Sequence, residues 1–186
     1  MNKALRQIFW GYVFIFFRLH VGIDLLADPI GYILLLSGCS KLIDAYPGAK
    51  KARIVALVGI FISIPSVFVN LSETSLSIGW SSYSILLLVL KTIMGYYMFV
   101  VLKDVAEAFG DQALQGRTVN TFKFYMAIHL FALALLSFSM NVPGDGWVAL
   151  SIISFIGALV MDILLLLLIG AIRRISPEQL RVNTHI

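Results

Sequence analysis

The sequence contains a single cysteine, few charged residues and none of the common catalytic or cofactor-binding motifs. Because Cys39 is alone, an internal disulfide and any metal or iron–sulfur site built from several cysteines are excluded. The sequence also lacks a GxSxG nucleophile elbow, an HExxH zinc helix, a phosphate-binding glycine loop and a dinucleotide fingerprint. These absences disfavour hydrolase, metalloprotease and nucleotide-driven functions, and we expect no cofactor.

Hydrophobic residues, in contrast, are abundant. They make up 60% of the 186 residues, against 13% charged, and the mean hydropathy is +0.93. Too few polar groups remain to cover a water-soluble globule of this size. A membrane span needs about 20 mostly apolar residues. The sequence therefore predicts an all-α, polytopic integral membrane bundle of about six transmembrane helices, with apolar stretches at residues 5–26, 29–44, 54–71, 83–102, 122–140 and 147–172.

The first two stretches have a second interpretation. The stretch at 29–44 is short for a span, so stretches one and two could instead form a re-entrant hairpin that dips into the bilayer. In either case Asp28 is expected to cap the second helix, with Pro29 as its first residue. An internal Pro65 should kink the third helix. We expect one helix-bundle domain over residues 1–175 and a short polar cytoplasmic tail over 176–186.

Basic residues mark alternate connections between these stretches. Twelve of the fourteen lysines and arginines fall there, and the opposite connections hold none. This is the positive-inside pattern of a multi-pass plasma-membrane protein with both termini in the cytoplasm. The basic residues are dispersed among loop ends, so they predict contact with anionic lipid headgroups and no nucleic-acid partner. The polar segment 103–121 is expected to be a cytoplasmic extension lying on the membrane surface; a dedicated partner-binding element is the alternative.

Two ionisable residues lie deep inside apolar stretches. An Arg, Lys or Asp at the centre of a span costs about 2.5–3.5 kcal/mol on insertion scales, so each needs a partner or water. Lys91 and Asp162 would satisfy each other, although their expected depths differ by roughly 10 Å at the helical rise. We predict that they meet in the bundle or through water. The pair would either fix helix register or form a proton- or ion-linked site.

A second polar cluster follows the first apolar stretch and contains Arg18, His20, Asp24 and Asp28. The last three are spaced by four residues and share one helix face while the helix continues. A histidine and two carboxylates could ligate a divalent metal, orient a proton relay or bind a polar substrate. A structural polar turn is the simpler interpretation, so we assign no metal site. His129 is expected to form an interhelical hydrogen bond rather than act as a ligand.

Small residues predict close helix packing. Glycine lets the backbones of membrane helices approach each other. The expected packing positions are Gly31, Gly38, Gly59, Gly95 and Gly157 with Ala158.

The segment from Gly22 to Leu42 resembles a motif of small multi-pass membrane proteins of Gram-positive, Bacillus-like bacteria, a group without characterised activity. The matching residues are Asp24, the turn Asp28-Pro29-x-Gly31-Tyr32, and Gly38 with Leu42. Ala27 stands where such proteins would have a proline, so the turn is expected to be less rigid. The resemblance covers about one ninth of the chain and implies a bacterial plasma-membrane location, with no catalytic residues to carry over.

Three function hypotheses follow from these residues. The first is small-solute or ion-linked transport that uses the charged interior, with a homo-oligomer or a membrane partner helping to form the pathway. The second is a non-catalytic assembly or sensory subunit whose buried charges are structural. The third is an intramembrane enzyme that uses His20 with Asp24 or Asp28, which we consider less favoured than the other two.

Overall fold

The computed structural model of the chain describes residues 1–21, 27–68, 78–138 and 145–182, without the side chains of 17–21, 27, 68, 78, 145 and 176–182. All the secondary structure in these ranges is helical. The helices are α1 (Asn2–Val21), α2 (Ala27–Ser40), α3 (Gly48–Ser63), α4 (Pro65–Phe68), α5 (Ile78–Ala108), α6 (Gln112–Phe138) and α7 (Asp145–Val182).

Three helices, rather than the six expected, are long and apolar enough to cross a membrane within the described residues. They cover Gly79–Ala108, Gln112–Phe138 and Gly146–Ile175. At about 1.5 Å per residue, the 14 residues of α2 and the 16 of α3 fall short of a hydrocarbon core about 30 Å thick. Helix α1 has 20 residues, but Lys3, Arg6 and Arg18 are among them. The expectation of six spans is therefore wrong, because apolar composition alone does not fix where a helix ends.

Proline and glycine account for two further differences from expectation. Pro65 separates α3 from α4 instead of kinking one helix, since proline cannot donate the backbone hydrogen bond that would continue α3. The polar segment 103–121 is not a separate surface element. It forms the last residues of α5 and the first residues of α6, which a tight turn joins. In this turn Gly110 has φ +69°, and the Asp111 carboxylate caps α6 by accepting a hydrogen bond from the Leu114 N–H at 3.0 Å.

Two other helix ends differ from the sequence prediction. Helix α2 begins at Ala27, so Asp28 lies in its first turn instead of capping it. An acidic residue in the first turn is favoured by the positive end of the helix dipole. Helix α7 runs through Pro177 to Val182, beyond the expected start of the tail at residue 176.

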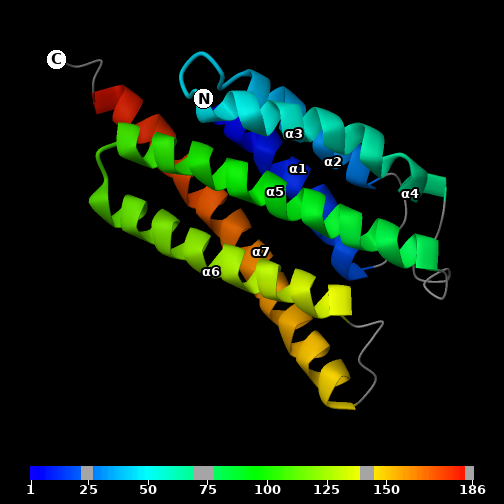
Figure 1. The fold of residues 1–186 in the computed structure, drawn as a ribbon. Coiled ribbons are helices and arrows are strands. Elements are labelled where there is room, and N and C mark those ends of the chain that lie inside the picture. Colours follow the sequence, from blue (N-terminus) through cyan, green and yellow to red (C-terminus); the bar gives the residue numbers. More distant parts are fainter. Residues whose placement is uncertain (22–26, 69–77, 139–144, 183–186) are drawn as a thin grey trace.

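The helices alternate in direction, and this alternation gathers the basic residues at one end of the bundle (Figure 1). That end holds the start of α1, the α2–α3 and α5–α6 connections and the end of α7. We call it the basic end. Its exposed cations, among the described side chains, are Lys3, Arg6, Lys41, Lys50, Lys51, Arg53, Lys103, Arg117, Lys123 and Arg174.

Glycines allow close contacts in the core, as predicted for Gly31, Gly38, Gly59 and Gly95. A Cβ at Gly31 would lie 2.8 Å from the Gly11 carbonyl oxygen, so α1 and α2 pack backbone against backbone. A Cβ at Gly59 would lie 2.5 Å from the Tyr32 ring. The packing at Gly157 is looser, with a Cβ 3.3 Å from Ile128.

Large apolar side chains also cover the outside of the bundle. On α7 these include Ile152, Ile153 and Ile156, each more than half exposed. A soluble monomer rarely exposes so much contiguous apolar surface. Together with the three long apolar helices, this surface indicates a membrane protein in contact with the lipid bilayer.

Candidate functional site

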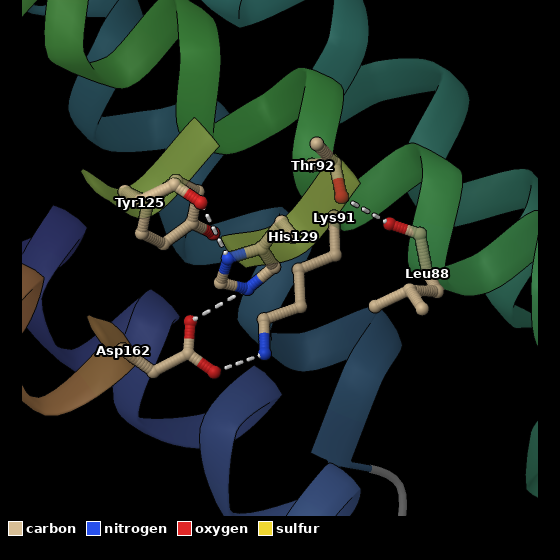
Figure 2. A network of polar contacts seen from close by, with 6 residues as sticks. All are labelled: Leu88, Lys91, Thr92, Tyr125, His129 and Asp162. Atoms are coloured by element: carbon tan, nitrogen blue, oxygen red, sulfur yellow. Dashed lines mark hydrogen bonds and ion pairs between the residues drawn. The ribbon is translucent and has the colours of Figure 1, made fainter. Parts of the chain in front are cut away.

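A buried ion pair joins two of the candidate spans. Lys91 of α5 donates through Nζ to Oδ2 of Asp162 on α7, and each residue is only 4% exposed (Figure 2). The contact predicted from the sequence is therefore present. Two structural features bring Lys91 and Asp162 to the same level in the bundle despite their different expected depths. Helix α5 begins at Ile78 rather than near Tyr83, so Lys91 lies further from the start of its helix than expected. Helix α7 also crosses the bundle obliquely (Figure 1).

The imidazole of His129, on α6, completes the site from the third candidate span. Its Nε2 lies 3.5 Å from Oδ1 of Asp162, the carboxylate oxygen that Lys91 does not contact, and its Nδ1 lies 3.0 Å from the backbone oxygen of Tyr125 (Figure 2). The ring stacks on that of Tyr125, with centroids 3.9 Å apart. The expected interhelical hydrogen bond is not what the structure shows: the hydrogen bond of His129 is to its own helix, and its contact with α7 is the 3.5 Å approach to Asp162. The sequence did not indicate that His129 joins Lys91 and Asp162. We call Lys91, His129 and Asp162 the charged triad.

Several polar atoms around the charged triad lack hydrogen bonds within the described part of the chain. They include the hydroxyls of Tyr12 and Ser154, both buried. The Tyr125 hydroxyl, His129 Nε2 and Asp162 Oδ1 are also buried, and they interact with one another without meeting hydrogen-bond geometry. A buried polar group without a partner costs about 1–3 kcal/mol, so such a concentration in one region is uncommon in a purely structural core.

The charged triad lies at the inner end of a partly open cavity of about 220 Å³ between α5, α6 and α7. Lys91 and His129 line it together with Ser84, Ser151 and Ser154; leucine, alanine and phenylalanine side chains form the rest of the wall. Ser84 precedes Lys91 on α5 by two helical turns, and Ser151 lies near the start of α7. The cavity therefore extends from the charged triad away from the basic end.

The other predicted site residues are described only in part. Arg18 and His20 belong to α1, but their side chains are outside the described set, and Asp24 falls between the described ranges. Asp28 is buried, 5% exposed, in the first turn of α2. The role of this cluster, as a structural polar turn or as a site for a polar ligand, therefore stays a prediction.

Two members of the site were missed in the sequence. Tyr125 and Tyr12 are unremarkable aromatic residues in apolar stretches, and only the fold brings them near Asp162 of α7. The spacing of four residues between Tyr125 and His129 was the one available signal, since it places both on one helix face. Within the ranges that the structure describes, no three His, Cys, Asp or Glu side chains are grouped to hold a metal ion.

The fold and the site define an all-α membrane protein with three candidate spans that share one buried charged site. Comparison of the chain with models of protein families, with curated proteins and with solved structures finds no match. The site's own chemistry is therefore the basis for the function proposed below.

Proposed function

We propose that this protein is a small multi-pass plasma-membrane protein for small-solute or ion-linked transport, with the charged triad as its central site. One observation carries the proposal: a lysine, a carboxylate and an imidazole from three candidate spans meet at the inner end of a cavity. Ionisable groups at this depth are expensive and typically mark substrate or ion pathways.

A purely structural role fits the cavity poorly. Replacing a buried ion pair by well-packed apolar residues is often neutral or stabilising, so stability alone gives little reason to keep one. A pair that only fixes helix register would also be expected in dry, close-packed surroundings. Here Lys91 and His129 instead face a cavity with three serines in its wall.

The positive-inside rule assigns the basic end to the cytoplasm, with both termini on that side. The cavity would then open toward the outer face. Helices α1 and α2, too short or too charged for simple spans, would form a re-entrant hairpin packed against α7 and α3, with the basic residues at anionic lipid headgroups. The resemblance of residues 22–42 to Gram-positive membrane proteins supports a bacterial plasma membrane.

A second copy or a membrane partner would complete the pathway. Three spans are few to enclose a solute, and the first half of α7 exposes apolar side chains around much of its circumference, including Val148, Ile152, Ile153 and Phe155. Association along this surface would narrow the open side of the cavity.

Cysteine accessibility tests the proposal. In a Cys39→Ala background, Ala158→Cys places a thiol in the cavity wall, and Ile156→Cys places a matched thiol on the exposed apolar surface of the same helix. A membrane-impermeant thiol reagent is applied to each side of oriented vesicles. We expect labelling of Ala158→Cys from the outer side only at rest, with Ile156→Cys unmodified because lipid excludes the reagent.

Transport further requires access to change sides. A change of pH that alters the protonation of the charged triad should make the Ala158→Cys thiol accessible to the reagent from the cytoplasmic side. Protection of Ala158→Cys from both sides, in protein shown to be folded, would contradict the proposal. The alternative, a non-catalytic assembly or sensory subunit with the Lys91–Asp162 pair as a structural lock, would then hold.

A further inference from the structure

The tautomer of His129 follows from its two neighbours. A backbone carbonyl can only accept, so the Nδ1 atom 3.0 Å from the Tyr125 oxygen must carry hydrogen and donate it. In the neutral ring Nε2 is then an acceptor. It faces Asp162 Oδ1 at 3.5 Å, and a carboxylate oxygen is also an acceptor.

Two acceptors thus face each other in a buried site. Neither atom meets hydrogen-bond geometry with any described residue. The Tyr125 hydroxyl interacts with the Asp162 carboxylate, which leaves His129 Nε2 as the acceptor without a donor. The Lys91 ammonium donates its hydrogen bond to the other carboxylate oxygen of Asp162, Oδ2. One proton from solvent, placed between Nε2 and Oδ1, would satisfy both atoms and convert the contact into a charge-assisted hydrogen bond.

The charge of the site changes with this proton. The Lys91 ammonium and the Asp162 carboxylate cancel, so the site is neutral when His129 is neutral and carries one positive charge when the proton is bound. Among the described side chains, the other titratable groups near the site are Tyr125 of α6, Tyr12 of α1 and Tyr32 of α2. Phenols are uncharged at neutral pH, so they do not alter this charge count. A net charge in an apolar membrane interior is costly and favours binding of a counter-ion.

We propose that the His129–Asp162 contact binds one proton and that the cavity then binds a small amphipathic monoanion, such as a short aliphatic carboxylate. This inference rests on the proposed function, of which it names the substrate class and the coupling ion. The proton and the anion bind together, because each reduces the electrostatic cost of the other, and the linkage is reciprocal.

The cavity fits such a ligand in both charge and shape. Lys91 uses one of its three N–H donors on Asp162, which leaves donors for an anionic head group. The Ser154 hydroxyl, buried at 5% exposure and without a hydrogen bond in the described structure, lines the same cavity. Leu88, Ala132 and Phe155 provide an apolar wall for an aliphatic tail.

Calorimetric titration of the purified full-length protein in detergent tests this inference, with hexanoate as the probe. Repeating the titration in two buffers of different ionisation enthalpy counts the protons taken up. We expect about one proton per bound hexanoate, and an affinity that falls about tenfold per pH unit on the alkaline side. Hexanamide, which has the same shape without the charge, and hexylammonium should bind at least tenfold more weakly.

Three variants sharpen the result. His129→Gln should abolish the proton uptake and weaken hexanoate binding. Ser154→Ala keeps the charged triad and should weaken hexanoate about tenfold, the effect of one hydrogen bond to a charged group, so it tests the site even if His129→Gln does not fold. Thr92→Val is the matched control, since the Thr92 hydroxyl bonds to the Leu88 carbonyl of its own helix and does not line this cavity.

The outcomes separate this inference from the proposed function. Hexanoate that binds no better than hexanamide, or without proton uptake, overturns the inference even if Ala158→Cys is labelled and the cavity is open. Proton-linked hexanoate binding, combined with an Ala158→Cys thiol whose access never changes sides, supports the inference and contradicts transport.

Discussion

The ring of Tyr125 on α6 occupies the space that a side chain at Gly95 on α5 would need. A Cβ at position 95 would lie 2.6 Å from the Tyr125 ring, and this ring in turn stacks on the imidazole of His129. The missing side chain at Gly95 therefore helps to position His129 against Asp162, two helices away.

Gly95→Ala should displace the Tyr125 ring and destabilise the protein by about 1–3 kcal/mol, the usual cost of overpacking. Gly116→Ala is the matched control on α6, because nothing lies within 4 Å of its Cβ position. It should be neutral or stabilise by up to about 1 kcal/mol through helix propensity. Thermal unfolding in detergent compares the two, and equal melting temperatures would contradict the role of Gly95.

Lys91→Met should leave the Asp162 carboxylate buried without its main partner and destabilise the protein by about 3–5 kcal/mol. The double variant Lys91→Met with Asp162→Asn removes both charges and should recover most of that loss. Thermal unfolding of Lys91→Met, Asp162→Asn, the double variant and the unchanged protein gives a double-mutant cycle, which measures the interaction energy between the two side chains. Additive losses would mean that the two side chains do not interact.

Cys39 should resist thiol reagents in the folded protein, since its side chain is fully buried in α2. A thiol must be exposed to react, so labelling should require unfolding or local opening. Ala45→Cys in the Cys39→Ala background places an exposed thiol just beyond the same helix and should react at once. Fast labelling of native Cys39 would disprove the close packing of α1 and α2.

The two ends of the bundle should lie on opposite sides of the membrane. In the Cys39→Ala background, Ala113→Cys reports on the basic end and Gly146→Cys on the other end, both at exposed positions. By the positive-inside rule an impermeant reagent should label Gly146→Cys in right-side-out vesicles and Ala113→Cys in inverted ones. The opposite pattern would place the basic end outside.

Much of the architecture could be predicted from the sequence because lipid imposes local rules. Long apolar stretches identified an all-α membrane protein, and the cost of isolated charges predicted that Lys91 and Asp162 would meet. Helix ends were less predictable. Local backbone geometry sets the tight turn from Phe109 to Asp111 and the separation of α3 from α4 at Pro65. The apolar composition of a segment does not reveal this geometry.

The sequence alone determined the helical class, the membrane environment and the segregation of basic residues, since each follows from the cost of placing polar groups in hydrocarbon. Only the tertiary structure decided which helices are long enough to span, that His129 faces the free oxygen of Asp162, and that a cavity ends at the charged triad. These features depend on how α7 crosses α5 and α6, which is set by packing among side chains distant in the sequence.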